Sequence, residues 1–311
     1  MDLSVVVVSW NTRDHLERCL RALVEDATPL AREVLVVDNA SSDGSGDLVR
    51  REFPSVRLFA EARNTGYAAG NNRGIRASEG AFVCLLNSDA SVRPGALDRL
   101  VAFLRENPGY AAAAPKLLHP DGSLQRACMR FPRLSTALFF DTVLDRLFPR
   151  NRVVARYFLR DFDHLRASDV DQPPASCLVL RRAALDAVGL FDEDLFLFFN
   201  DVDLCLRLWR AGWRIRYLPD AEVVHVGGAS TSRYDRFVVE WHRNRLAYYR
   251  KHYGPLGAGL LRLVIAARAI EESFRIRRRV PPGAGRREEM RRLRAAVREV
   301  LFGGREVARS A

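Results

Sequence analysis

The chain of 311 residues has only scattered cysteines and no long uncharged apolar run. Its five cysteines form no Cys-x-x-Cys pair, which favours a reducing compartment and argues against a disulfide framework or a zinc site. The first residues after Met1 lack the basic segment that begins a secretory signal. No apolar run reaches the length of a membrane-spanning helix. These absences predict a cytoplasmic protein.

Lysine is also scarce, so arginine supplies nearly all of the positive charge. The net charge is +11, and Lys116 and Lys251 are the two lysines. A basic chain suits nucleic acid, phosphates or an anionic membrane surface. The sequence has no zinc finger, RNA-binding aromatic motif or clear helix-turn-helix, so no nucleic-acid partner is expected. A basic surface that only keeps the protein soluble is the alternative.

Buried strands and helices alternate in the first third of the chain. Residues 4–9, 33–38 and 81–86 are apolar runs typical of strands that are covered on both faces. Residues 12–24 and 94–106 have the periodicity of helices. This alternation predicts an α/β fold with a doubly wound, mostly parallel sheet. Such sheets bind ligands at the carboxyl ends of their strands.

Polar residues follow several of these strands and are therefore expected at one edge of the sheet. Asp38 ends the second strand, where a carboxylate can accept the N3–H of a pyrimidine base. An ordinary Asx turn is the alternative for Asp38. Residues 64–74 are predicted to form a Gly/Asn-rich loop whose backbone approaches a ligand. This loop lacks the Gly-Lys-Ser/Thr ending of a Walker motif, so NTP hydrolysis is not expected.

A divalent metal site is predicted after the strand of residues 81–86. Asp89 follows Asn87 and Ser88 there and offers a hard oxygen ligand for Mg²⁺ or Mn²⁺. His225 ends another short strand and is the candidate second ligand. The alternative is that His225 has only a structural role.

Asp201 and Asp203 follow an aromatic run and open an amphipathic helix. A carboxylate beside apolar residues costs free energy unless it has a use. The N-terminus of the helix is expected to favour the ionised form of Asp201, as a general base requires. The alternative is that both residues only cap the helix.

In this order the motifs resemble the family 2 glycosyltransferases, which have the GT-A nucleotide-sugar-binding fold. The resemblance covers residues 3–254 and is greatest to the bacterial rhamnosyltransferase-like branch. No single motif is specific, but the ordered set is. It comprises residues 4–11, 37–45, 64–74, 86–90, 189–193, 200–204 and 225–230.

The resemblance implies a role for each motif residue. Asp201 matches the catalytic base, and Asp89 and His225 match the metal ligands. Asp38 would bind the base of the nucleotide, and Asp203 and Arg207 would support the helix of Asp201. The other donor-site residues would be Asn11, Asn39, Asn64, Gly66, Asn72 and Asn87.

Two positions depart from the family pattern. Asn87 stands where the metal motif has its first acidic residue, and Asn200 stands where Glu often precedes the base. The Gln-x-x-Arg-Trp motif of processive members is absent, so the addition of a single sugar is expected. The resemblance implies inverting transfer from dTDP-rhamnose or a UDP-sugar to a hydroxyl of a lipid-linked or cell-envelope glycan. A sugar-nucleotide-binding module without catalysis and a nucleotidyltransferase are the alternatives.

Residues 1–254 are expected to form the catalytic domain. Within it, residues 131–171 are an Arg- and aromatic-rich insertion, helical or mobile, that either covers the acceptor or packs as part of the structure. Residues 255–311 are expected to form a basic helical extension. This extension either lies peripherally on the inner face of the cell membrane or packs as an ordinary helix on the domain.

Overall fold

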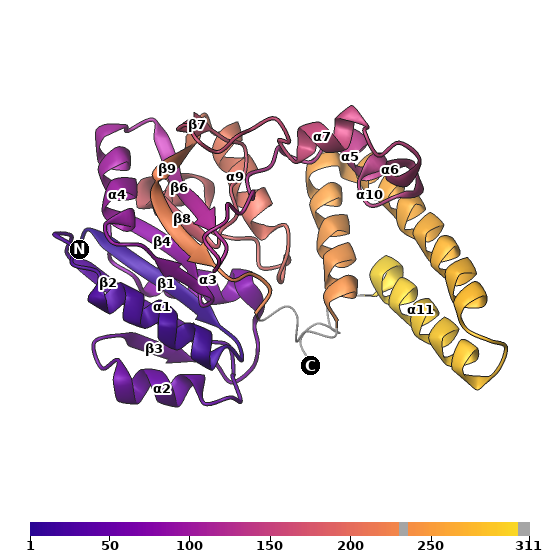
Figure 1. Cartoon of the computed structure of the whole chain (residues 1–311), viewed down its shortest axis with the longest axis horizontal. Coiled ribbons are helices and arrows are strands. Elements are labelled where there is room, and N and C mark those ends of the chain that lie inside the picture. Colours follow the sequence, from indigo (N-terminus) through magenta and orange to yellow (C-terminus); the bar gives the residue numbers. More distant parts are fainter. Residues whose placement is uncertain (230–235, 304–311) are drawn as a thin grey trace. The chain divides into compact units, whose positions relative to one another are not determined.

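The computed structural model describes residues 1–229 and 236–303 (Figure 1). The chain divides into two compact units. The first unit comprises residues 1–131, 161–196 and 200–234 and contains the whole sheet; the second comprises residues 132–160, 197–199 and 235–311. The described part of the second unit is helical.

The first unit is a mixed, mostly parallel sheet, as the strand–helix alternation predicts. Strands β1 (Leu3–Ser9), β2 (Arg32–Asp38), β3 (Arg57–Ala60) and β4 (Phe82–Asn87) are parallel. Their order in the sheet is β3-β2-β1-β4, and the sheet continues as β8-β6-β9-β5, with β7 paired to β9. The bounds of these strands are β5 (Ala90–Val92), β6 (Tyr110–Leu118), β7 (Ser168–Asp169), β8 (Cys177–Arg181) and β9 (Arg214–His225).

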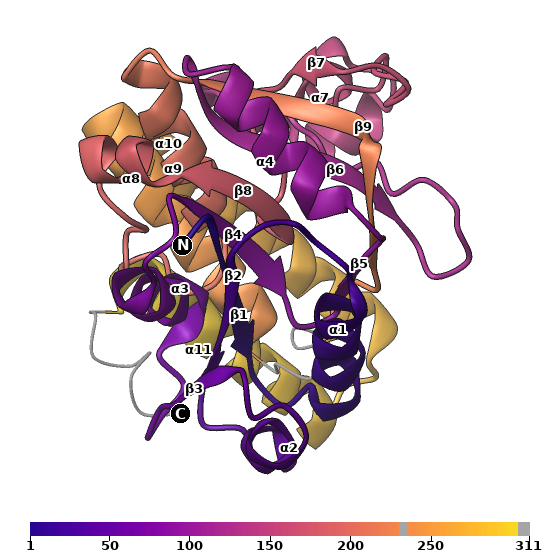
Figure 2. The same cartoon turned by 90° about the vertical axis from the view of Figure 1, so that its left-hand side faces the viewer.

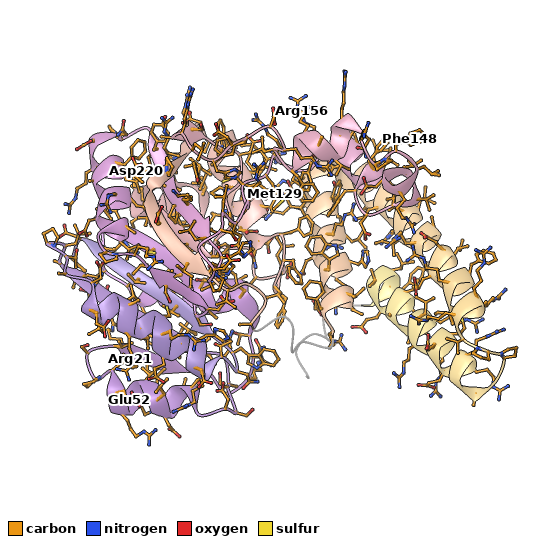
Figure 3. All side chains as sticks on the ribbon, in the orientation of Figure 1. Arg21, Glu52, Met129, Phe148, Arg156 and Asp220 are labelled. Atoms are coloured by element: carbon orange, nitrogen blue, oxygen red, sulfur yellow. The ribbon has the colours of Figure 1, made fainter. Side chains whose placement is uncertain are left out.

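Helices cover both faces of this sheet. Helices α1 (Arg13–Glu25), α2 (Ser45–Glu52) and α4 (Ala96–Glu106) share one hydrophobic core with Val5 and Val7 of β1. Arg21 of α1 and Glu52 of α2 form an ion pair at 2.9 Å on this side (Figure 3). Helix α3 (Gly66–Ala77) lies on the opposite face (Figure 2). Helices α8 (Arg182–Val188) and α9 (Asn200–Arg210) complete the unit.

The expectation of a loop over residues 64–74 was wrong, because most of this segment is helix α3. A Cβ atom at Gly74 would lie 2.3 Å from Cγ1 of Val6, and one at Gly70 would lie 2.9 Å from Cγ1 of Val8. These two glycines therefore let the helix approach β1 closely. Gly70 and Gly74 therefore have a packing role between helix and strand.

The second unit is built around the long helix α10 (Phe237–Arg279) and helix α11 (Ala284–Phe302). The short helices α5 (Leu134–Phe139), α6 (Val143–Leu147) and α7 (Arg152–Tyr157) occupy much of the predicted insertion, so its helical alternative is the observed one. Gly254, where the sequence suggests a domain boundary, is a kink inside α10, with Pro255 directly after it.

Helix α10 also corrects the expectation that no segment is long and apolar enough to span a membrane. One 18-residue window of this helix has a mean hydropathy of 1.2, and 22% of the window is buried. Arg262 and Arg268 interrupt the apolar run, but two charges do not bring the window below that hydropathy. Length and composition alone would therefore allow α10 to cross a bilayer.

Candidate active site

The ends of three neighbouring strands bring the predicted polar residues together. Ser9 of β1 is paired with Asp38 of β2, and Val8 of β1 is paired with Asn87 of β4. Asp38 and Asn87 therefore lie on either side of the end of β1. This register confirms that the carboxyl ends of the strands converge at one edge, where ligands bind in parallel α/β sheets.

Asp38 and Asn11 lie within one network of hydrogen bonds. The Ser41 N–H donates to Oδ1 of Asp38 at 3.2 Å, so this carboxylate takes part in an Asx-type turn. Oδ1 of Asn11 accepts from the Ser42 N–H at 2.8 Å, and the Asn11 N–H donates to Oγ of Ser41 at 2.9 Å. Asn11 therefore supports the turn that follows Asp38.

Asn39, directly after the end of β2, and Asn64 both form hydrogen bonds with the start of α3. Nδ2 of Asn39 donates to the Gly66 carbonyl at 3.1 Å, and Oδ1 of Asn39 accepts from Thr65 Oγ1 at 2.9 Å. Oδ1 of Asn64 accepts from the Gly66 N–H at 2.9 Å. A Cβ atom at Gly66 would lie 2.6 Å from the Phe196 carbonyl oxygen. The lack of a side chain at Gly66 therefore lets the start of α3 pack against the backbone of Phe196.

Asn72 is occupied by contacts inside the protein. Its Nδ2 donates to the Phe191 carbonyl at 2.9 Å and to Glu193 Oε1 at 2.8 Å, and its Oδ1 accepts from the Phe191 N–H at 3.0 Å. The residue is 1% exposed. In this conformation Asn72 ties α3 to the segment after α8.

Asn87, Asp89 and His225 form a compact cluster. Nε2 of His225 lies 3.4 Å from Oδ1 of Asp89 and 3.4 Å from Nδ2 of Asn87. Nδ1 of His225 lies 2.8 Å from Oε1 of Gln125, an oxygen that accepts a hydrogen bond when Nδ1 carries a proton. Burial opposes ionisation of Asp89, but the contacts of its carboxylate with His225 and the Ala229 N–H outweigh burial and lower the pKa of Asp89.

The separation of Asp89 and His225 would suit two neighbouring ligands of a divalent cation. Ligands at neighbouring positions of an octahedral Mg²⁺ or Mn²⁺ site lie about 3 Å apart, close to the separation of Asp89 and His225. Within residues 1–229 and 236–303 no three His, Cys, Asp or Glu side chains group as a metal site. Phosphate oxygens and water would therefore have to supply the other ligands, as is usual for Mg²⁺.

Asp201 lies in the first turn of α9. The Val202 N–H donates to its Oδ1 at 2.8 Å, and the Ala175 N–H lies 3.4 Å from its Oδ2. Burial raises the pKa of Asp201, and these backbone donors oppose the rise without cancelling it. The start of the helix favours the ionised form of Asp201, as expected, but burial has the larger effect on its pKa.

Asp203 and Arg207 brace the fold. Asp203 is fully buried, and its Oδ2 accepts from Nε of Arg207 at 2.9 Å. The same guanidinium donates to the carbonyls of Val188, Gly189 and Leu190 at 2.7, 2.9 and 2.7 Å. The pair therefore holds the end of α8 to α9, which agrees with a supporting role.

The sequence patterns do not identify two residues that lie near the site, Gln125 and Tyr67. Gln125 lies outside the resemblance motifs, and its contact with His225 joins positions far apart in the chain. Tyr67 lies inside the motif of residues 64–74, and its hydroxyl donates to the Ala175 carbonyl at 2.8 Å. The N–H of Ala175 faces Asp201, so Tyr67 fixes a residue that supports the candidate base.

A family model described as glycosyltransferase like family 2 matches residues 2–245. The chain belongs to this family. A relative from Mycobacterium tuberculosis named N-acetylglucosaminyl-diphospho-decaprenol L-rhamnosyltransferase is 35% identical over 244 residues, which cover 74% of this chain and 78% of the relative. The pre-mycofactocin glycosyltransferase of the same organism is 30% identical over 227 residues, which cover 72% of this chain and 42% of that protein.

Solved structures show that this glycosyltransferase has the GT-A fold. The mannosyltransferase PcManGT from Pyrobaculum calidifontis, in complex with GDP-Man and Mn²⁺, has a TM-score of 0.55 at 17% identity, over 96% of this chain and 87% of that chain. TarS 1-349 from S. aureus, in complex with UDP-GlcNAc, has a TM-score of 0.54 at 18% identity, over 97% and 82% of the two chains. At these identities the likeness concerns the fold alone.

Proposed function

We propose that this family 2 glycosyltransferase transfers one L-rhamnosyl unit from dTDP-rhamnose to a hydroxyl of a lipid-linked, diphosphate-bound glycan. The observation that carries the proposal is the 35% identity to the L-rhamnosyltransferase over 78% of that relative's length. A UDP-sugar is the second candidate donor, because uracil and thymine present the same N3–H to Asp38. The proposed location is cytoplasmic, at the inner face of the cell membrane.

In the proposed mechanism Asp201 is the catalytic base. Its carboxylate accepts the proton of the acceptor hydroxyl, and that oxygen forms a bond to the anomeric carbon. The bond from this carbon to the nucleoside diphosphate breaks on the opposite face, so the configuration inverts and the diphosphate keeps the electron pair. The hydrogen bond from Val202 and the nearby Ala175 N–H hold the carboxylate in place.

Asp89 and His225 would hold the divalent metal, with Gln125 orienting the imidazole. A bound Mg²⁺ or Mn²⁺ would supply charge stabilisation on the departing diphosphate. Asn87 contributes an uncharged amide at this position, so the cluster has one negative charge fewer than an acidic residue would give. We include metal dependence in the proposal, with Asp89 as the one carboxylate ligand.

A panel of nucleotides tests the donor site. UDP, dTDP, GDP, ADP and CMP are each added with and without Mn²⁺, and the melting temperature is measured. A ligand that binds only the native state stabilises it, so dTDP or UDP should raise the melting temperature, and Mn²⁺ should enlarge the shift. A preference for GDP, or no shift with dTDP or UDP, would contradict the assignment of Asp38.

The alternative of a binding module without catalysis is favoured by Asn87 and Asn200, where the family has acidic residues. Asn200 is 2% exposed, and its Oδ1 accepts from the Asp201 N–H at 2.8 Å, so it acts on the backbone of α9. This alternative predicts donor binding without transfer. The family match leaves the nucleotidyltransferase without a supporting observation.

The acceptor lid remains a proposal for residues 131–171. Phe140 packs against Tyr157 and Phe158, with ring centroids 5.5 and 5.2 Å away, and of these three residues Tyr157 is buried. Phe148 is 57% exposed and stands on the outer side of the short helices (Figure 3). Phe148 and Phe158 are the exposed aromatic residues of this segment and are therefore our candidates for contact with a lipid-linked acceptor.

Peripheral membrane contact is proposed for the second part of α10. Leu256, Leu263, Ile270 and Phe274 are between 58% and 71% exposed, and their spacing places them on one helix face. This exposed apolar face of α10 ends at Arg275 and at Arg277–Arg279. Arginines at the end of an apolar face can reach lipid headgroups while the apolar side chains enter the acyl boundary.

The charge of the second unit supports an anionic bilayer as the partner. This unit has 25 Lys and Arg residues against 10 Asp and Glu, whereas the first unit has 24 against 28. The net charge of +11 therefore divides into +15 on the second unit and −4 on the first. Attraction of basic segments to anionic lipid is worth about 1 kcal/mol per Lys or Arg near the surface.

The double variant Leu263→Ser, Ile270→Ser is expected to bind phosphatidylglycerol vesicles about 10²-fold more weakly than wild type. Burying one such side chain contributes about 1.5–3 kcal/mol, and 1.4 kcal/mol corresponds to a tenfold change. Co-sedimentation measures the binding. Leu165→Ser in the first unit is the matched control, because Leu165 and Leu263 are both 71% exposed. Equal binding by the control and the double variant would contradict the membrane proposal.

A further inference from the structure

Phe199, two residues before Asp201, has a left-handed backbone conformation. Its φ is 62°, a region in which the Cβ atom of a bulky L-residue is crowded by the backbone. Such a conformation persists only where the surrounding structure holds it, and it is typical of functional sites.

One face of α10 packs around the segment that contains Phe199. The Phe199 ring is 6% exposed, and its centroid lies 5.1 Å from that of Trp241 and 5.4 Å from that of Tyr248. The neighbouring Phe198 ring lies 5.3 Å from Trp241 and 4.9 Å from Phe237. Aromatic pairs at these separations attract one another beyond the effect of their buried area.

A buried amide on the same helix face binds the backbone of this segment. Asn244 is 2% exposed, and with its amide oriented to satisfy its hydrogen bonds, Oδ1 accepts from the Leu197 N–H at 3.2 Å and the Phe198 N–H at 3.1 Å. Phe237, Trp241, Asn244 and Tyr248 are spaced by four, three and four residues, so they lie on one side of α10. These four residues are here called the α10 clamp.

The backbone held by the clamp leads directly into the helix that carries Asp201. Helix α9 begins at Asn200, so the φ of Phe199 sets the direction in which the first turn of α9 leaves the segment. Within that turn the Asp201 carboxylate accepts from the Val202 N–H and faces the Ala175 N–H. Val202 lies in the same turn as Asp201 and would move with it, so a change at Phe199 would shift the carboxylate relative to the Ala175 N–H.

We propose that the α10 clamp positions the Asp201 carboxylate by holding residues 197–199, with Asn244 as its key positioning residue. The inference rests on the proposed role of Asp201 as base. A displacement of about 1 Å at a catalytic group can lower the rate about 10²-fold. The clamp therefore acts on the rate of transfer and leaves donor binding unchanged.

The test compares Asn244→Ala, which removes the acceptor, with Asn244→Asp, which keeps an acceptor oxygen for the two N–H groups. Transfer from dTDP-rhamnose to GlcNAc-diphosphoprenol is measured, together with the affinity for dTDP. Asn244→Ala is expected to lower kcat about 10²-fold with the dTDP affinity within about threefold of wild type. Asn244→Asp should recover most of that loss. An unchanged kcat in Asn244→Ala would overturn the proposal.

A double-variant cycle separates positioning of Asp201 from general damage to the fold. If the clamp acts through Asp201, Asn244→Ala should cause no further loss of kcat in an Asp201→Asn background. Equal losses in both backgrounds would overturn the proposal. Full activity of Asp201→Asn alone would instead remove the proposed base.

A readout without substrate keeps the proposal testable if dTDP-rhamnose is not the donor. Hydrogen exchange is measured at the backbone amides of residues 200–203 in wild type and in both Asn244 variants. Faster exchange there in Asn244→Ala, restored in Asn244→Asp, supports the clamp. Equal exchange in all three proteins contradicts it, whichever sugar is transferred.

Discussion

Asp201→Asn is expected to lower the kcat for sugar transfer by about 10²–10⁴-fold, the usual contribution of a positioned general base. The amide oxygen of Asn can still accept the hydrogen bond from Val202, so the start of α9 should keep its conformation. The amide cannot accept a proton from the acceptor hydroxyl. The affinity for dTDP, measured by calorimetry, should therefore stay close to that of wild type.

Asp203→Asn is the matched control on the same helix. Asp203 is fully buried and pairs with Arg207, so its neutralisation should lower the melting temperature. Its effect on the kcat of the folded protein should be much smaller than that of Asp201→Asn. Near-normal turnover by Asp201→Asn, or equal losses in both variants, would show that Asp201 is not the base.

The stability of Asp201→Asn has an expected pH dependence. Burial raises the pKa of Asp201 in the folded state above its ordinary value, so ionising this carboxylate costs stability. This cost is fully present above the folded-state pKa and disappears as the pH falls below the ordinary value of about 3.9. Asp201→Asn should therefore be at least as stable as wild type at pH 7, and any advantage should vanish near pH 3.

Asp89→Asn is expected to remove the part of dTDP stabilisation that depends on Mn²⁺. Charge stabilisation by a bound metal is worth several kcal/mol, so losing the carboxylate ligand should weaken metal-dependent binding about 10²-fold or more. Calorimetric titration of Mn²⁺ in the presence of dTDP measures this directly. Exposed Asp220 supplies the control variant Asp220→Asn.

Gln125→Ala provides a graded version of the same experiment. The residue holds the His225 ring through Nδ1, and loss of such a partner typically weakens metal binding 10–100-fold.

Mn²⁺ binding by Asp89→Asn that equals that of wild type would contradict the metal site. An effect as large in Asp220→Asn would show that the change in charge, and not coordination, is responsible.

The sheet and the convergence of the site residues could be predicted because both depend on local pattern. The buried apolar runs of β1, β2 and β4 identify parallel strands, and parallel strands bring their carboxyl ends to one edge. Asp38 and Asn87 are therefore placed at the same edge of the sheet without any knowledge of side-chain contacts. The order of the motifs then led to the family that the comparison confirms.

Helix α3 and strand β6 could not be predicted with the same patterns. Glycines such as Gly70 and Gly74 have low helix propensity, so the local sequence favours a loop. In the fold, their lack of a side chain allows α3 to pack closely on β1. The Ala-rich run of β6 has low strand propensity, and Pro115 precedes an irregularity in its pairing with β9. Both elements depend on tertiary packing, which a single sequence does not display.

The electrostatics of the site also depend on tertiary contacts. Position at a helix N-terminus favours ionisation of Asp201, yet burial has the larger effect on its pKa. Asn72 is of a residue type that often binds ligands. Its amide instead donates hydrogen bonds to Phe191 and Glu193, which are more than a hundred positions away in the chain. The clamp on Phe199 is a further case, since it joins residues 197–199 to α10.

The most direct measurement is the transfer reaction itself, with dTDP-rhamnose as donor and GlcNAc-diphosphoprenol as acceptor. The products are identified by mass spectrometry, and the anomeric configuration of the new linkage is determined by NMR. The proposed function predicts one added rhamnose per acceptor, release of one dTDP, inversion at the anomeric carbon, and loss of the reaction in Asp201→Asn. A product that retains the donor's configuration, or donor binding without any transfer, would contradict it.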